Sequence, residues 1–273
     1  MFASFSYFST MRIIALLLIF LPRLTLAQDL ADFYAIPLKI SIPLEADQFI
    51  GVDAYKNLYY TKDKTLFKQS TDKTIQFSDL LLGDISEVDL TNPLRITLFY
   101  AESNTAVILD NTLNEITRIK FNELENFRNV SHARTASDRR LWIFNTDLQR
   151  LELYDYQNNT FNSDFNPQPY NALMLASNFN TCWVLTDDLL YEYNQYGSLL
   201  NKHTANGVGQ IQYSNDLLIG KYDGKLSVKA KSNNTWIPIK NLPEDSIAFY
   251  LNAGILYLYR SDLISTYKLN LPK

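Results

Sequence analysis

The chain has 273 residues and a formal net charge of −4, with 47% hydrophobic and 14% aromatic residues. This hydrophobic content supports a packed core and excludes an intrinsically disordered chain. The slight negative charge, without any cluster of Lys or Arg, argues against nucleic-acid binding, because nucleic-acid-binding proteins displace counterions with a basic surface. The composition therefore predicts a folded protein whose partners are not nucleic acids.

The first 27 residues have the pattern of a secretory signal peptide. Arg12 precedes an apolar run at 13–21, and the segment ends at Ala27, a small residue suited to cleavage. The run is shorter than the roughly 20 apolar residues that a membrane-spanning helix needs. The residues before Met11 add nothing to this pattern, so translation is expected to start at Met11. We expect cleavage after Ala27, export to the periplasm or cell surface, and no transmembrane segment in the mature chain.

A single cysteine, Cys182, lies in an apolar run beside Trp183. One cysteine cannot form an internal disulfide, so the exported domain must be stabilised by packing alone. We expect Cys182 to be a small buried side chain.

Residues 28–273 contain a weak repeat with a period of about 40 residues. Each copy has a short apolar or aromatic run, then a polar turn, then a second alternating run. The turns contain Asp63, Ser103-Asn104, Asp147, Asp187, Asp223 and Asp262. Self-similarity at this period is typical of propellers, solenoids and arrays.

Most segments are rich in aromatic and β-branched residues and are bounded by Asn, Asp, Ser or Gly, a pattern that predicts strands and hairpins. The second copy predicts strands at 86–90, 95–100, 106–110 and 115–121, and the third copy at 132–137, 141–144, 151–156 and near Phe161. Four antiparallel strands in 40 residues form one blade of a β-propeller. The helix-like stretch 122–130 lacks a convincing apolar stripe, and we expect a loop there.

We therefore expect an all-β fold, with one β-propeller domain over 28–273 that has six blades of four antiparallel strands. The segment Leu38–Pro43 precedes the first inner strand, and we expect it to pair near Leu263–Leu269 and close the ring. An open two-sheet β-sandwich is the competing fold. The repeated Asp residues are expected to cap hairpin turns by bonding their own backbone, because a repeat distributes them around the ring.

Motifs for catalysis are scarce. The sequence has two histidines, and it contains no Gly-x-Ser-x-Gly or His-Glu-x-x-His motif. We assign no catalytic residue, no cofactor and no metal site. The residues expected to line the mouth of a central channel, and to bind a ligand if there is one, are Asp89, His132, Arg134 and Gln210.

The stretch from Asp89 to Tyr100, followed by Val107 to Asn114, is the most distinctive in the chain. It resembles a family of uncharacterised exported β-propeller-like proteins of Bacteroidota, especially flavobacteria. The likeness covers the second blade closely and the other blades in layout. It implies a location in the envelope of a Gram-negative bacterium, and no activity or catalytic residue carries over. Within this stretch Asn92-Pro93 is expected to form a tight turn before the second strand.

These observations favour a monomeric, non-catalytic scaffold that binds a protein of the cell envelope through loops at one mouth of the ring. The alternative is a carbohydrate-binding or carbohydrate-active propeller with its site at the channel mouth. Convergence of the four channel residues into one polar pocket with perturbed carboxylates would favour the alternative. A quinone- or metal-dependent oxidoreductase is a third hypothesis, which a purified protein without chromophore or metal would exclude.

Overall fold

A computed structural model describes residues 32–270, apart from 163–164, 170, 230–234 and 244–247. The predicted signal peptide lies outside the described residues. The described residues form strands, turns and loops, which confirms the all-β prediction. No helix that could cross a membrane occurs among them. Residues 122–129 form a loop, as expected for the stretch 122–130, and Val130 begins the next strand.

Four antiparallel sheets have four strands each and follow one another along the chain. They consist of β2 (Gln48–Val52), β3 (Leu58–Lys62), β4 (Thr65–Gln69) and β5 (Thr74–Ser78); β6 (Glu87–Asp89), β7 (Ile96–Tyr100), β8 (Thr105–Leu109) and β9 (Glu115–Lys120); β10 (Val130–Thr135), β11 (Arg140–Asn145), β12 (Arg150–Asp155) and β13 (Thr160–Asn162); and β14 (Met174–Ser177), β15 (Thr181–Leu185), β16 (Leu189–Asn194) and β17 (Leu199–Thr204). The strands predicted for the second and third repeats match β6 to β13 to within two residues at each end.

The remaining strands form one eight-stranded sheet with the order β18-β19-β20-β21-β1-β24-β23-β22. Its strands are β18 (Val208–Ser214), β19 (Leu217–Tyr222), β20 (Lys225–Lys229), β21 (Trp236–Lys240), β22 (Ala248–Asn252), β23 (Ile255–Arg260), β24 (Leu263–Asn270) and the N-terminal β1 (Phe33–Pro43). This sheet differs from the predicted set of separate four-stranded sheets.

The eight-stranded sheet arises because β1 is long enough to pair on both sides. It pairs antiparallel with β24 from Tyr34 to Pro43, with a register shift between Pro37 and Ser41. Ser41 lies opposite Ser265, so Leu38–Pro43 meets the segment predicted for it. Its first residues, Phe33 and Tyr34, pair in parallel with β21. Sequence patterns gave no sign of this second pairing. It covers the edge of β21, which would otherwise expose unpaired backbone groups.

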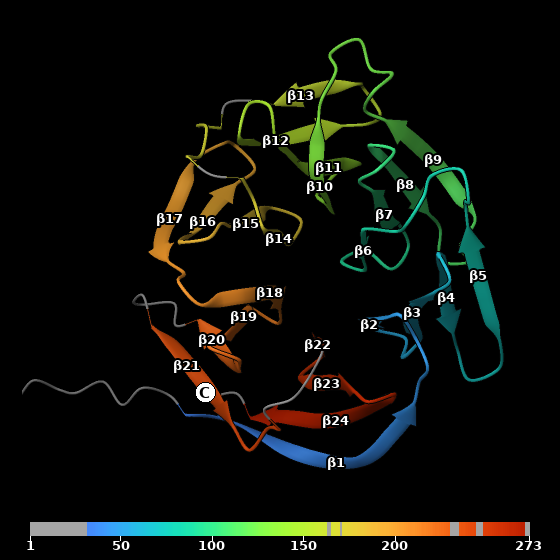
Figure 1. Cartoon of the computed structure of the whole chain (residues 1–273), viewed down its shortest axis with the longest axis vertical. Coiled ribbons are helices and arrows are strands. Elements are labelled where there is room, and N and C mark those ends of the chain that lie inside the picture. Colours follow the sequence, from blue (N-terminus) through green and yellow to red (C-terminus); the bar gives the residue numbers. More distant parts are fainter. Residues whose placement is uncertain (1–31, 163–164, 170, 230–234, 244–247, 271–273) are drawn as a thin grey trace, which may run out of the picture. The chain divides into compact units, whose positions relative to one another are not determined.

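The sheets lie around a central space, with the first strand of each group of four nearest the centre and the last strand outermost (Figure 1). The innermost strands are β2, β6, β10, β14, β18 and β22. Because the inner strands converge, side chains from distant parts of the sequence can meet at the centre.

Apolar layers fill the spaces between neighbouring sheets. Trp142 and Leu151 of one sheet pack with Cys182 and Tyr193 of the next in a single buried cluster. Strands β7 and β8 are buried along their whole length because both faces of their sheet are covered. Burial of each large side chain contributes about 1.5–3 kcal/mol. The fully buried Cys182 confirms the expectation that it is a core residue.

The first and last sheets also share a cluster, in which Phe49 and Leu58 pack with Tyr257 and Tyr259. Polar contacts accompany this packing, since Asn252 Nδ2 donates to the carbonyl oxygen of Val52 at 3.0 Å. The two ends of the sheet series are therefore in direct contact.

Candidate binding site in the central cavity

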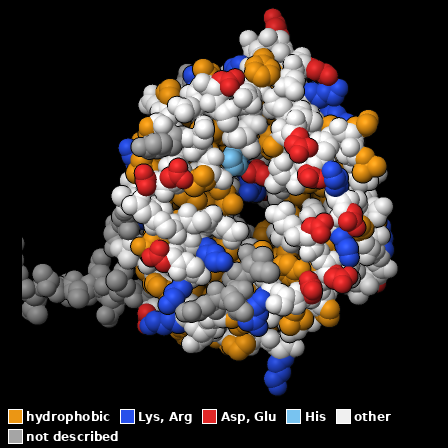
Figure 2. Space-filling view, viewed as in Figure 1, with side chains coloured by type: hydrophobic (Ala, Val, Ile, Leu, Met, Phe, Trp, Pro, Cys, Tyr) orange, Lys and Arg blue, Asp and Glu red, His pale blue; other side chains and the backbone are white. Residues whose placement is uncertain are grey.

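A cavity of about 430 Å³ lies where the inner strands meet. Its lining residues come from β2, β6, β10, β14, β18 and β22 and the loops that follow them. Figure 2 shows a hollow at the centre of the face in view. We call this space the central cavity.

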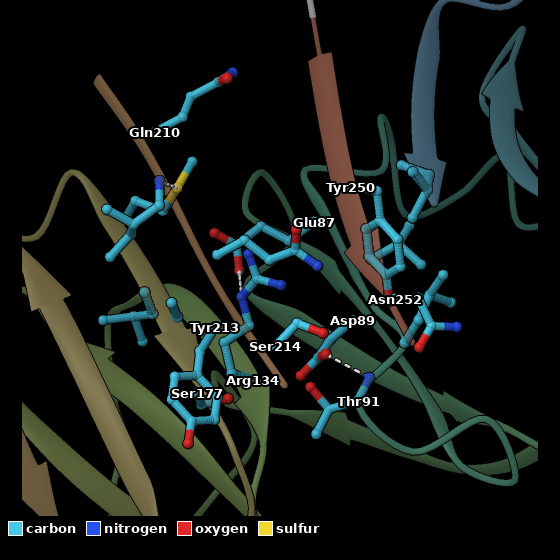
Figure 3. Close-up of a pocket in the computed structure, with 18 of the residues that line it drawn as sticks. Glu87, Asp89, Thr91, Arg134, Ser177, Gln210, Tyr213, Ser214, Tyr250 and Asn252 are labelled. Carbon is cyan, nitrogen blue, oxygen red and sulfur yellow. Dashed lines mark hydrogen bonds and ion pairs between the residues drawn. The ribbon is translucent and has the colours of Figure 1, made fainter. Parts of the chain in front are cut away.

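The structure places three of the four predicted channel residues at the central cavity. Asp89, Arg134 and Gln210 line it, and His132 does not. Figure 3 shows that Gln210 of β18 lies apart from the other two. The predicted binding role of these residues stays a prediction.

Glu87 of β6 and Arg134 of β10 form the charged centre of the cavity (Figure 3). Arg134 Nε lies 3.7 Å from Glu87 Oε2, and the two side chains are 21% and 14% exposed. These two atoms are buried and have no hydrogen-bond partner among the described residues. The pair is thus an ion pair with one unused donor and one unused acceptor.

Burial raises the pKa of Glu87, and the nearby charges of Arg134 and His132 oppose that shift only in part. For Arg134, burial acts to lower the pKa, but the carboxylates of Glu87 and Asp89 outweigh burial and raise it. The guanidinium therefore stays charged, whereas Glu87 is a carboxyl group that holds its proton more readily than an exposed one.

Asp89 has a structural role. Its Oδ1 accepts from the backbone nitrogen of Thr91 at 2.9 Å, and its Oδ2 accepts from that of Thr135 at 2.7 Å. The side chain is buried, with 3% of the residue exposed. Because both oxygens accept from the backbone, Asp89 fixes β6 against β10 and positions Glu87, two residues earlier on the same strand.

His132 forms hydrogen bonds with a side chain and with a backbone carbonyl group, close to the Glu87–Arg134 ion pair. Its Nδ1 lies 2.8 Å from Ser131 Oγ, and its Nε2 lies 3.1 Å from the carbonyl oxygen of Leu173. Nε2 is also 3.6 Å from Glu87 Oε1. His132 therefore flanks Glu87 from outside the central cavity.

Sequence reasoning missed Glu87 and Tyr250. Glu87 precedes Asp89 by two residues, so strand periodicity places both side chains on one face. The spacing between Glu87 and Asp89 could therefore have predicted that Glu87 also lines the cavity. Tyr250 lines the cavity from β22, where its ring packs against Gly51. An added Cβ at Gly51 would lie 2.5 Å from Tyr250 Cδ2, so this contact requires glycine.

The repeated turn aspartates do not cap their own turns as expected. Asp63, Asp223 and Asp262 instead adopt positive φ values of 49°, 46° and 60°, which Asp tolerates better than most residues. Capping of the nearby backbone falls to other residues, such as Asp110 and Asp155. Within the described residues, no group of three or more His, Cys, Asp or Glu side chains could hold a metal ion.

No protein-family model matches the chain, and no curated protein matches it. Among solved structures, PorZ, a bacterial surface component of the type-IX secretion system of Porphyromonas gingivalis, has a TM-score of 0.51 and 16% identity over 80% of this chain. The match covers 31% of the PorZ chain, so this chain spans about a third of that protein. A virginiamycin B lyase from Staphylococcus aureus has a TM-score of 0.57 and 12% identity, over 83% of this chain and 82% of the lyase.

The WD40 domain of Pan2 from Neurospora crassa is also similar, with a TM-score of 0.54 and 9% identity, over 81% of this chain and 74% of the other. At such identities the likeness concerns the fold alone. The chain is an all-β protein with a propeller-like fold, and the neighbours include a lyase, a secretion component and a WD40 domain.

Proposed function

We propose that the chain is an exported, six-bladed β-propeller that acts as a non-catalytic scaffold for a protein partner of the cell envelope. Two groups of four strands in the eight-stranded sheet repeat the layout of the separate sheets, which supports six blades. The cluster shared by the first and last sheets supports a closed ring, with β1 as the outer strand of the last blade. The signal-peptide pattern of residues 1–27 supports export.

The observation that carries the scaffold proposal is a pair of exposed leucines in the loop between β5 and β6. Leu80 is 77% exposed and Leu81 is 94% exposed. Neighbouring Leu82 is buried in the core between the first two sheets. These two adjacent, solvent-exposed leucines are available to a partner. Burial of each side chain at an interface would contribute about 1.5–3 kcal/mol to the free energy of binding.

The loop that presents these leucines is held in place. Asp79 Oδ1 accepts from the backbone nitrogen of Leu81 at 3.0 Å, and Asp79 Oδ2 pairs with Arg118 of β9 at 2.8 Å. A partner therefore meets apolar side chains on an ordered loop and loses little conformational entropy on binding. This geometry suits an anchor residue that enters a pocket of the partner.

Affinity purification from the native envelope, with mass spectrometry of the co-purifying proteins, tests the proposal. We compare the wild type with the double variant Leu80→Ser/Leu81→Ser. Leu94→Ser is the matched control, because Leu94 is 56% exposed in the loop at the opposite end of β6. We expect specific envelope proteins to be recovered with the wild type and the control and lost with the double variant. Recovery of background alone, or equal recovery with all three, would contradict the proposal.

A further inference from the structure

The buried Glu87–Arg134 pair departs from the geometry of a saturated ion pair. Arginine–carboxylate pairs that satisfy each other have N–O distances of about 2.7–2.9 Å and often use two parallel hydrogen bonds. Here Arg134 Nε lies 3.7 Å from Glu87 Oε2. Both atoms are buried and unpartnered among the described residues, a state that costs free energy unless another group bonds them.

The other acidic side chains at the cavity are already engaged. Asp89 accepts from two backbone nitrogens, as described above. Asp53 accepts from the backbone nitrogens of Tyr55 and Asn57, from Asn57 Nδ2 and from the hydroxyl of Tyr59. The cavity therefore offers a ligand the partly exposed carboxylate of Glu87 and the partly exposed guanidinium of Arg134, side by side.

The charges of Glu87 and Arg134 determine whether the cavity favours an anionic, a cationic or a neutral ligand. An anion would approach Arg134 but would be repelled by Glu87, Asp53 and Asp89. A cation would be attracted by these carboxylates, but it would leave the buried donor of Arg134 without a partner. A neutral molecule with neighbouring hydroxyl groups can donate to the Glu87 carboxylate through one hydroxyl and accept from the Arg134 guanidinium through another.

The remainder of the lining matches a neutral polyhydroxy ligand. Tyr213 and Tyr250 supply aromatic surface for the C–H groups of a sugar ring. Gln48, Gln210 and Ser214 supply amide and hydroxyl groups. The volume of about 430 Å³ falls in the range of about 300–1,000 Å³ that is usual for small-molecule sites.

We propose that the central cavity binds a neutral saccharide, with adjacent hydroxyl groups of one sugar ring bridging the partly exposed carboxylate of Glu87 and guanidinium of Arg134. The site lies at the inner strands, whereas the exposed leucines lie in a peripheral loop. Saccharide binding is therefore independent of the protein partner proposed above, and the purified chain alone is enough to test it.

Ligand-observed NMR and calorimetry with the purified full chain test this proposal. The probes are D-glucose, D-galactose and N-acetyl-D-glucosamine at millimolar concentration, with citrate as an anionic comparison. We expect at least one of the sugars to bind and citrate not to bind. Absence of binding by all three sugars, or binding of citrate at the same site, would overturn the proposal.

Variants then locate the bound sugar. Glu87→Gln keeps the shape of the side chain but removes the charged acceptor, and we expect affinity to fall by about tenfold to a hundredfold. Glu45→Gln is the matched control, because Glu45 is exposed on the surface and its side chain is 82% accessible. The control is expected to bind like the wild type. Unchanged affinity in Glu87→Gln, or an equal loss in the control, would overturn the proposal.

A single substitution in a buried pair can also destabilise the fold. The double variant Glu87→Met/Arg134→Met avoids this problem, because apolar residues of similar volume often replace a buried ion pair without loss of stability. We expect it to fold, as judged by circular dichroism and thermal unfolding, and to lose sugar binding. A folded double variant that still binds sugar would overturn the proposal.

Discussion

The carboxylate of Asp89 on β6 accepts a hydrogen bond from the backbone nitrogen of Thr135 on β10 at 2.7 Å. This bond joins two sheets that have no backbone pairing with each other. A second contact close by, between Thr97 Oγ1 and Thr135 Oγ1 at 2.9 Å, strengthens the same junction. The buried side chain of Asp89 thus links two sheets by a hydrogen bond, as backbone hydrogen bonds link the strands within each sheet.

Replacement of Asp89 by Ala should destabilise the protein by about 3 kcal/mol, because the buried nitrogen of Thr135 and the partly buried nitrogen of Thr91 lose a charged acceptor. Urea-induced unfolding, followed by tryptophan fluorescence, measures this change. Asp72→Ala is the control, since Asp72 is exposed in the turn between β4 and β5 and its replacement should have little effect. Equal stability of the two variants would show that the bond between the sheets contributes nothing.

Gly51→Ala should destabilise by about 1–3 kcal/mol, because the new methyl group overlaps the Tyr250 ring. A second substitution, Tyr250→Leu, should relieve the overlap, so that the double variant is more stable than the sum of the two single effects. Gly209→Ala serves as the control, since an added Cβ there meets no atom within 4 Å. Additive effects in the cycle would contradict this account of the contact between the first and last sheets.

Ala35→Asp should destabilise by about 3 kcal/mol or more, because it places an unpaired charge at a buried position of β1. Ile36→Asp, one residue along, should be tolerated, because successive side chains of a strand point to opposite faces and Ile36 is 46% exposed. Thermal unfolding of the two variants tests whether β1 is docked as an outer strand. If both variants unfold at the same temperature, β1 does not contribute its inner face to the core.

Asp155 should give the protein part of its resistance to acid. Burial acts to raise the pKa of this carboxyl group, but hydrogen bonds from Asn158 and Gln157 outweigh burial and lower it. The stability from these bonds is present above the unfolded pKa of about 3.9 and is lost as the pH falls through the lower folded pKa. Asp155→Asn, which cannot titrate, should therefore lose less stability between neutral pH and strong acid than the wild type. An identical pH dependence of thermal unfolding in the two proteins would contradict this assignment.

The intact mass of the exported protein should correspond to a chain that begins at Gln28. This outcome follows from cleavage after Ala27, where the signal-peptide pattern ends. Mass spectrometry of the protein purified from culture medium or periplasm measures it directly. A chain that keeps residues 12–27 would show that this segment is not removed.

Local patterns predicted the strands of the second and third repeats, because turn residues mark their ends. Asn92 is an example: its carbonyl oxygen accepts from Arg95 and its Oδ1 accepts from Leu94, so the turn expected at Asn92-Pro93 is confirmed. Alternation was a weaker guide. Ser227 and Lys229 of β20 are buried although they occupy the polar positions of an alternating run, because both faces of that sheet are covered.

The cavity was harder to predict, since its residues converge only through tertiary structure. Arg134 and Asp89 could be assigned to inner strands from the repeat, but their different roles depend on partners elsewhere in the chain. Asp89 is saturated by the backbone, whereas Arg134 faces a carboxylate that the sequence analysis did not consider. Strand position alone does not distinguish an engaged carboxylate from a free one.

The pairing of β1 has a consequence for how the protein folds. Tyr34 pairs with Asn270 and, in parallel, with Lys240, so β1 has no partner until the distant strands β21 and β24 have been made. Contacts this distant in sequence carry a large loop-closure entropy and slow the final step of folding. The earlier sheets can form as each one is completed, whereas the N-terminal strand must wait for the last. The pairing of β1 with β21 and β24 is thus a late step of folding.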